Sequence, residues 1–308
     1  MATTMTAPVS NSIGLAQKYL PILDEIYKEG AKSSILDTAE YNVRWIGAKT
    51  IQLFNSASVG LGNYNRNAGF QVGDVTQAWE NYALAIDRGR SFSIDAMDDD
   101  ETLGMAFASL LGEFERVHVV PEVDAYRFAK YAGLATTANK TAASDPTSSS
   151  VNIASQIDAG MAAMDENEVP HEGRIAFLSP KAYENLKANV ARYTLNLEKD
   201  VNNNIEMYND LRIVKVPQSR FATVCTLNAP TTSSGAGGYT LSGNNLNFLI
   251  VDPRATMQVI KHLVPRVFSP EVNQEADAWK FDYRVYHDAF VQAQKLNGIY
   301  VGLGTAIA

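Results

Sequence analysis

The sequence predicts a protein of the α+β class. Three observations support this prediction: a long amphipathic helix pattern between residues 98 and 120, apolar runs typical of strands on both sides of it, and a middle portion that mixes helix and strand signals. No sequence period of about 20 to 50 residues recurs, which excludes solenoids and propellers.

Length and composition are those of a folded globular protein. The chain has 308 residues, of which 46% are hydrophobic and 19% are charged. This balance excludes wholesale disorder, collagen-like repetition and a coiled-coil rod, and the length allows one large domain or two medium ones. The formal net charge of -8 provides no global electrostatic basis for wrapping nucleic acid or lying on anionic lipid.

The number of cysteines and the N-terminal sequence indicate the cellular compartment in which the protein is expected to fold. The single cysteine, Cys225, excludes an internal disulfide and a cysteine-rich zinc site, so we expect a reducing cytoplasm. The N-terminus shows no basic segment followed by an apolar run, and no stretch approaches the ~18 continuous apolar residues of a membrane span. Neither secretion nor membrane insertion is expected.

The N-terminal region predicts an arm followed by a short helix. Residues 1–12 are mostly small and polar and have little to bury, which predicts a flexible arm. Residues 13–27 partly follow helical spacing, but Pro21 interrupts them, so we expect a short broken helix.

Two strands are predicted next, over residues 43–54 and 84–94, because apolar residues share one parity, as Leu84, Phe92 and Ile94 do. Between them lie about 30 residues rich in Gly, Asn and aromatic side chains, too many for an ordinary hairpin connection. The aromatic residues argue against disorder, and a loop without its own core is expected to bury them against a neighbouring subunit. The expected contact residues are Tyr64, Arg66, Phe70 and Trp79.

The strongest helix signal follows these strands. Asp98 and Glu101 have the spacing of a capping box, and apolar residues then recur at helical spacing up to Val117. This helix is predicted to run for roughly 30 Å before Pro121. A second helical piece is predicted to end at Gly133.

Two boundaries are predicted in the second half of the chain, in the small polar residues 136–150 and in the glycine- and serine-rich residues 231–245. The portion between them mixes helix and strand signals, and strand signals return after it. The predicted elements are a helix over 151–165, a buried strand over 174–180, a helix over 181–190, and strands over 246–251 and 279–285.

Five segments stand in order along the chain: DRGRSFSIDAMDDDE (87–101), PEVDAYRFAKYA (121–132), RIAFLSPKAYENL (174–186), VPQSRF (216–221) and FLIVDPRA (248–255). Together with the polar arm and the strand-loop-strand region before them, this order resembles tailed-bacteriophage major capsid proteins. The resemblance covers nearly the whole chain. It implies the phage capsid shell fold, which is shared with encapsulin compartments.

The resemblance also implies a division of the chain into the parts of that fold. These are an N-terminal arm (1–40), an extended loop formed by a β-hairpin (41–97), a peripheral domain (98–149 and 246–308) with a spine helix (98–120), and an axial α/β domain (150–245).

The implied function is that of a structural subunit and not of an enzyme. Such a subunit self-assembles into the hexamers and pentamers of an icosahedral head, in the cytoplasm of a host bacterium, and becomes part of the virion. Its other implied partners are a portal protein and double-stranded DNA, which the acidic chain would enclose and not grip.

Two departures from members of this family are informative. Some begin with a charged helical scaffold segment, whereas this chain passes almost at once into the polar arm, so we expect a separate scaffolding protein. Some cross-link through a lysine of the extended loop, but residues 55–83 contain Arg66 and no lysine. Cross-linking of that kind is not expected.

Residues that often form catalytic or metal sites have structural explanations here. The acidic residues Asp95 and 98–101 precede a predicted helix, where carboxylates are stabilised by capping and by the helix dipole. The glycine-rich residues 235–238 lack the ending of a phosphate loop, and Cys225 has no histidine near it in sequence. No HExxH pair occurs among the four histidines, His118, His171, His262 and His287. No catalytic residue, metal or cofactor is therefore expected.

Three alternatives remain at this point. An encapsulin-type nanocompartment shell would share the fold and would need a groove for cargo peptides. A soluble enzyme would need convergent polar residues with perturbed pKa values in a pocket. A decoration protein of a virion is disfavoured because such proteins are usually much shorter.

Overall fold

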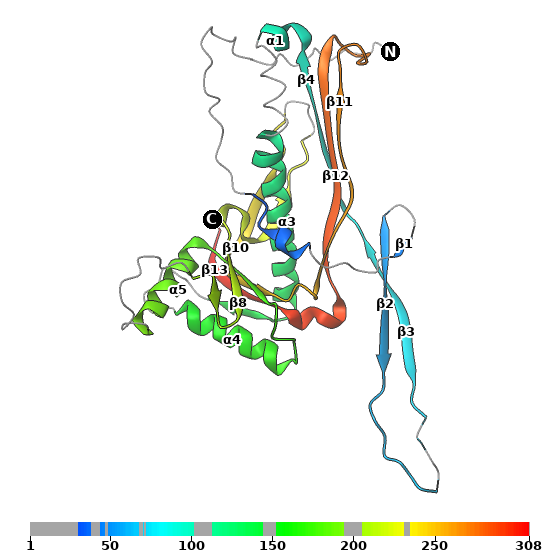
Figure 1. Cartoon of the computed structure of the whole chain (residues 1–308), viewed down its shortest axis with the longest axis vertical. Helices are drawn as coiled ribbons and strands as arrows, with labels where there is room; N and C mark the ends of the chain where they lie inside the picture. The colour runs from blue at the N-terminus through cyan, green and yellow to red at the C-terminus, as the bar shows by residue number, and fades with distance from the viewer. Residues whose placement is uncertain are drawn as a thin grey trace.

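The molecule consists of a layered body, a long upright sheet and a projecting hairpin (Figure 1). The computed structural model describes residues 30–37, 44–46, 49–67, 70, 72–101, 113–143, 152–193, 205–230 and 235–307. These ranges contain both helices and several sheets, so the predicted α+β class is confirmed.

The body is built on a mixed seven-stranded sheet with the strand order β5-β13-β10-β6-β8-β7, and β9 pairs with the first part of β10. The pairs β13 with β5 and β6 with β8 are parallel, whereas the others are antiparallel. The strands are β5 Thr141–Ala143, β6 Ile175–Leu178, β7 Met207–Tyr208, β8 Leu211–Lys215, β9 Ala222–Leu227, β10 Tyr239–Val251 and β13 Ile299–Ala306.

Helices cover both faces of this sheet because its central strands bury side chains on both sides. In β6, Ile175 and Phe177 belong to the core beneath α3, whereas Ala176 and Leu178 belong to the core beneath α4 and α5. A fully apolar strand between two helical layers is the expected result of such two-sided burial. The helices are α3 Val120–Thr137, α4 Ile153–Glu166 and α5 Pro180–Tyr193, which confirms the helices predicted over 151–165 and 181–190.

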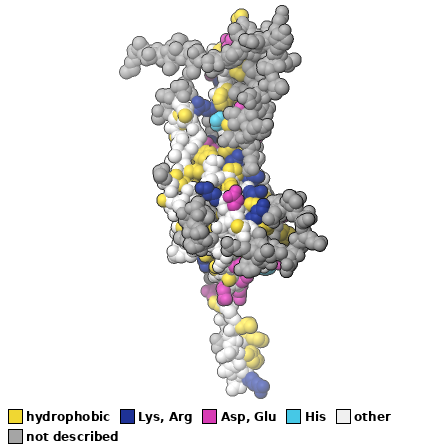
Figure 2. Space-filling model, turned by 90° about the vertical axis from the view of Figure 1, so that its left-hand side faces the viewer, with side chains coloured by type: hydrophobic (Ala, Val, Ile, Leu, Met, Phe, Trp, Pro, Cys, Tyr) yellow, Lys and Arg dark blue, Asp and Glu magenta, His cyan; other side chains and the backbone are white. Residues whose placement is uncertain are grey.

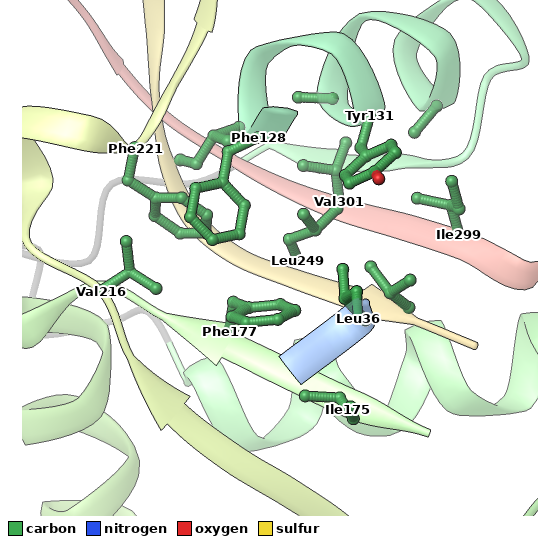
Figure 3. Packing of buried hydrophobic residues seen from close by; sticks show 14 of the residues in the cluster. Leu36, Phe128, Tyr131, Ile175, Phe177, Val216, Phe221, Leu249, Ile299 and Val301 are labelled. Atoms are coloured by element: carbon green, nitrogen blue, oxygen red, sulfur yellow. The ribbon is translucent and has the colours of Figure 1, made fainter. Parts of the chain in front are cut away.

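Aromatic rings fill the core beneath α3 (Figure 3). The ring of Phe128 lies 5.0 Å from that of Phe177 in β6 and 5.3 Å from that of Phe221, between centroids. Both contacts are edge-to-face, the arrangement that the ring quadrupoles favour. These contacts join the long helix to the body.

The long helix does not end at Pro121, so that prediction is wrong. Residues 113–114 are helical, Glu115–Val119 (η2) forms a π-helical turn, and α3 continues through Pro121 and Gly133 to its end. Pro121 lies in the first turn of α3, directly after the π turn, where the missing N–H is tolerated. Residues 102–112 are outside the described ranges. No helix among the described residues is long and apolar enough to cross a membrane.

The upright sheet has the order β11-β12-β4 (Figure 1). It packs Phe281 and Tyr283 against Phe114 of the long helix, with ring centroids 6.5 and 5.7 Å apart. The strand predicted over 279–285 is confirmed as part of β12, and the strand predicted over 84–94 is confirmed from Ile86 onward as β4. The bounds are β4 Ile86–Asp95, β11 Thr256–Phe268 and β12 Ala278–Val291.

Strand β10 begins inside the glycine- and serine-rich segment that the sequence predicts to be a boundary. Residues 239–242 pair with β9, and the register shifts between Ser242 and Asn245. Gly243, within this shift, has a φ of 77°, a conformation that residues with a Cβ atom rarely adopt. The glycine therefore allows the strand to bend, and the predicted strand 246–251 is its second half.

The projecting hairpin contains β1 Arg44–Ile46, β2 Thr50–Ser58 and β3 Val75–Ala83, in the order β1-β2-β3. The predicted strand 43–54 is confirmed in part, since it is divided between β1 and β2. The partner of β2 is β3, within the segment predicted as loop, and not the strand over 84–94. Leu84 and Ala85 connect β3 directly to β4 of the upright sheet.

The described N-terminal residues are held to the body by a buried carboxylate. Asp124 of α3 accepts hydrogen bonds from the backbone N–H groups of Lys32 (2.8 Å) and Ser33 (3.1 Å) and from the Ser33 hydroxyl (2.6 Å). Arg220 forms an ion pair with the same carboxylate at 3.2 Å. Leu36, in the 3-10 turn η1 (Ser33–Leu36), lies in the core beneath α3. The predicted helix over 13–27 lies outside the described residues.

Candidate intersubunit site

Two aromatic side chains meet on one face of the hairpin. Phe54 of β2 stands opposite Trp79 of β3 in the antiparallel register, and their ring centroids are 5.1 Å apart in an edge-to-face arrangement. Phe54 is 53% exposed and Trp79 is 48% exposed. Such a pair contributes roughly 0.5 to 1.5 kcal/mol beyond the area that it buries. It stabilises the hairpin register and still leaves a large apolar surface in water.

A second aromatic pair lies toward the tip. The ring of Tyr64 is 4.9 Å from that of Phe70, and these side chains are 60% and 87% exposed. The Arg66 side chain in the same region is exposed. The structure therefore brings Tyr64 and Phe70 together near the tip and places Trp79 separately on β3.

The sequence analysis did not identify several exposed aliphatic residues of the hairpin. They extend the apolar surface of the hairpin, which Figure 2 shows gathered on one side of the projection. The sequence analysis also did not identify Phe54 as an exposed contact residue. Had β3 been predicted as a strand, the pairing of Phe54 with Trp79 across the two strands could have been predicted as well. The aliphatic residues are Val59, Leu61, Val72 and Val75.

The base of the hairpin is fixed by a core of its own. Ile51 of β2 and Leu84 are buried with Tyr286 and Phe290 of β12. The Tyr286 hydroxyl donates a hydrogen bond to the Leu84 carbonyl at 2.9 Å. Tyr82 packs its ring 5.2 Å from Phe290, and burial, followed by the nearby Glu80, raises the pKa of Tyr82 to about 12. The hairpin is therefore anchored at one end and exposed along the rest of its length.

Asp288 of β12 holds the connection between the hairpin and the upright sheet. This buried carboxylate accepts hydrogen bonds from the Ala85 N–H (2.9 Å), the Tyr126 hydroxyl (2.8 Å) and the Ala289 N–H (2.8 Å). Burial and the hydrogen bond to Asp288 raise the pKa of Tyr126 well above its ordinary value. The helix, β12 and the start of β4 are joined at this residue.

A cleft with a volume of about 490 Å³ lies between the long helix, β4, β12 and residues 235–238. Three of its charged side chains, Arg88, Arg90 and Glu122, are bonded to the protein itself. Arg88 pairs with Glu122 at 2.8 Å and donates to the Asn228 carbonyl, and Arg90 donates to the Gly235 carbonyl. These contacts give the three side chains a role in holding the fold together.

Among the acidic and histidine residues, His171 lies 3.6 Å from both Asp165 and Asp210. Asp95, and not Asp98, caps the short helix α1 (Ala96–Glu101), because its carboxylate accepts the N–H of Met97 at 2.9 Å. This corrects the predicted capping box. Among the described residues, no group of three or more His, Cys, Asp or Glu side chains is placed to hold a metal ion. Burial raises the pKa of Cys225 to about 11, which disfavours the reactive thiolate.

Comparison with known proteins gives a result only at the level of structure. No family model matches the sequence, and no curated protein is similar to it. A chain of the capsid of cyanophage P-SCSP1u superposes with a TM-score of 0.65 at 14% identity, over 95% of this chain and 93% of that one.

Two other phage structures superpose over similar lengths. A chain of the mature capsid of bacteriophage PhiM1 gives a TM-score of 0.60 at 15% identity, over 94% of this chain and 93% of that one. A chain from Mycobacterium phage Che8 gives 0.60 at 11% identity, over 95% and 97%. The protein therefore has the phage capsid shell fold over nearly its whole length, as the sequence resemblance implies.

Proposed function

We propose that this protein is the major capsid subunit of a tailed bacteriophage. The observation that supports the proposal most strongly is the projecting hairpin, which exposes aromatic and aliphatic side chains on a chain with the phage capsid shell fold. A monomeric protein rarely exposes contiguous apolar surface of this kind without a partner. In this proposal the partner is another copy of the same chain.

The apolar side chains of the hairpin supply the driving force for association. Burying one large apolar side chain contributes about 1.5 to 3 kcal/mol. Under closed symmetry each subunit both presents its hairpin and receives one, so a moderate contact is repeated many times in a shell. The proposed contact residues are Tyr64, Arg66, Phe70 and Trp79.

The finer features of the proposal follow from the implied family and from the charge of the chain. The subunits form hexamers and pentamers of an icosahedral head, with help from a separate scaffolding protein and around a portal protein. The net charge of -8 suits a wall that encloses double-stranded DNA without gripping it. The final location is the virion, after assembly in the host bacterial cytoplasm.

Expression of the chain alone and together with its genomic neighbours tests this proposal. Sedimentation and negative-stain electron microscopy should detect closed shells, or capsomers that close when the scaffolding protein is supplied. A subunit that remains a monomer or dimer under both conditions would contradict the proposal. The contents of the particles separate a phage head from an enzyme-filled compartment.

A further inference from the structure

We propose that the outer edge of β3 pairs with an edge strand of a second copy of this chain, so that a sheet continues across the subunit boundary. The proposal rests on the proposed function as a shell subunit and specifies the chemistry of one contact. β3 is the last strand in the order β1-β2-β3, and no strand within the described residues pairs with its other edge.

The hydrogen bonds at the two ends of the hairpin show which backbone groups face that edge. The Val59 N–H donates to the Asp74 carbonyl at 3.4 Å, and the Leu84 N–H donates to the Lys49 carbonyl at 2.8 Å. Both pairs have an even-numbered residue on the β3 side, in one unbroken register. Since hydrogen-bonded and non-hydrogen-bonded pairs alternate in an antiparallel ladder, the even-numbered residues of β3 face β2. The odd-numbered residues, including Gln77 and Asn81, therefore direct their N–H and C=O groups to the open edge.

The open edge lacks the features that normally prevent strand addition. β3 has the sequence VTQAWENYA, nine residues with a single charge, Glu80, and no proline or glycine. Its pairing with β2 runs from Val75 to Ala83 without a bulge. Natural proteins usually protect edges with lysine, proline, bulges or very short strands. An unprotected edge of this length is expected to be covered in the functional state.

Three other edge strands, β5, β7 and β11, are protected. β5 and β7 have three and two residues. β11 is long, but it contains Lys261, Pro265 and Arg266, and its register shifts near Ile260. The contrast within one chain indicates that the edge of β3 is kept available for pairing, as in complexes formed by strand addition.

A second copy of the chain is the partner that fits the position of this edge. The edge belongs to the projecting hairpin, far from the layered body (Figure 1), and the half-exposed pair of Phe54 and Trp79 lies on the same ribbon. A neighbour that covers those rings also approaches the backbone of β3. Main-chain pairing then fixes the register, while the rings contribute apolar contact area.

Substitution at Gln77 tests the proposal because this side chain is exposed. Gln77→Pro removes an outward N–H and leaves the ladder with β2 intact, as proline is tolerated on edge strands. Gln77→Ala, the matched control, removes the side chain and keeps the N–H. We expect Gln77→Ala to assemble as the wild type does, and Gln77→Pro to need a subunit concentration at least about tenfold higher. Circular dichroism and urea unfolding of unassembled subunits check that both variants fold.

The outcomes separate the two proposals. If Gln77→Pro forms shells as readily as the wild type, the edge pairing is wrong while the shell function stands. If the wild-type chain forms no assembly even with scaffolding protein, both proposals are wrong.

Hydrogen exchange on wild-type particles provides a second measurement that needs no variant. The amides of Gln77 and Asn81 should exchange rapidly in dissociated subunits and slowly in shells. The amide of Glu80, which faces β2, is the internal reference and should be protected in both states. Equal rapid exchange of the two odd-numbered amides in both states would overturn the proposal.

Discussion

Trp79 illustrates how a single residue has a role in the subunit and, in our proposal, a second role between subunits. Its contact with Phe54 stabilises the pairing of β2 with β3, while about half of its surface stays in water. In the isolated subunit the indole therefore buries only about half of its surface.

Trp79→Ala is expected to leave the subunit folded and to weaken assembly. The substitution removes exposed apolar area that the neighbour would cover, at a cost of about 2 kcal/mol or more per contact. The measurement is the subunit concentration at which shells appear by sedimentation, together with the heat resistance of any particles. Val224→Ala on β9 is the matched control, because Val224 is 46% exposed but lies away from the hairpin. Trp79→Ala particles that form and resist heat as the wild type does would contradict the contact assignment.

Asp124 shows the opposite case, a residue whose role lies within the subunit. Asp124→Asn keeps the shape of the side chain but removes the negative charge beside Arg220 and replaces an acceptor with a donor. We expect a loss of about 3 kcal/mol in the free energy of unfolding, because a buried charge pair is broken on one side. Urea unfolding of unassembled subunits measures it. Asp87→Asn, in the exposed pair with Arg284, should change stability little, and equal effects of both substitutions would refute the explanation.

His287 gives the subunit a defined dependence on pH. Burial, followed by the positive charge of Arg127, lowers the pKa of His287 from 6.5 to about 4, although Asp288 acts in the opposite direction. The unfolded chain therefore binds a proton between these values that the folded chain does not, so stability falls as the pH drops through this window. At pH 5 the loss relative to pH 7 amounts to about 2 kcal/mol.

The comparison of wild type with His287→Gln isolates this contribution. The free energy of unfolding is measured at pH 7 and pH 5 for both proteins. The variant should show the smaller difference, since its side chain does not titrate. A difference as large as that of the wild type would show that other groups cause the dependence.

At the scale of elements, the hairpin divides into an anchored base and an exposed tip. The base is held by the core around Ile51 and Tyr286, whereas Tyr64 and Phe70 at the tip form an exposed ring pair. Removal of the tip should therefore leave the rest of the structure unchanged.

Replacement of residues 60–73 by Asn-Gly tests this division. Val59 and Asp74 form a hydrogen-bonded pair, which is the geometry that a two-residue turn closes. We expect the shortened subunit to unfold at the same urea concentration as the wild type and to fail to form closed shells. Closed shells of normal stability from this variant would show that the tip is not needed for assembly.

The sequence analysis predicted helices and strands that bury one or both faces. It missed the strand whose two faces are both exposed. The parity of Phe281 and Tyr283 follows from packing against the long helix, so β12 was found. β3 was missed because both faces of the hairpin are largely exposed beyond its base, which leaves no strict alternation of apolar and polar residues. The helix was predicted to end at Pro121, but a π turn directly before this proline allows the helix to continue. That π turn has no recognisable sequence signature.

At the scale of the whole molecule, the fold was predicted from the order of five sequence segments, which resembles that of phage capsid proteins. The superpositions confirm the phage capsid shell fold that this resemblance implies. The proposed contact site was predictable only in part. Aromatic residues in an unexplained segment pointed to Tyr64, Phe70 and Trp79, but the pairing of Trp79 with Phe54 depends on a register that only the structure supplies. The predicted division into arm, loop, peripheral and axial domains stays a prediction.

The overall shape has a functional consequence. The hairpin extends far beyond the layered body in Figure 1, so in an isolated subunit most of its apolar side chains have no core to enter. An assembly in which each hairpin lies on a neighbour removes this exposure for every copy at once.

Electron cryomicroscopy of the particles formed with the genomic neighbours tests the central claim most directly. We expect a closed icosahedral shell in which the hairpin of each subunit lies on an adjacent subunit, with Trp79 covered. Shells in which the hairpins extend into solvent, or a preparation that contains only monomers and dimers, would contradict the account.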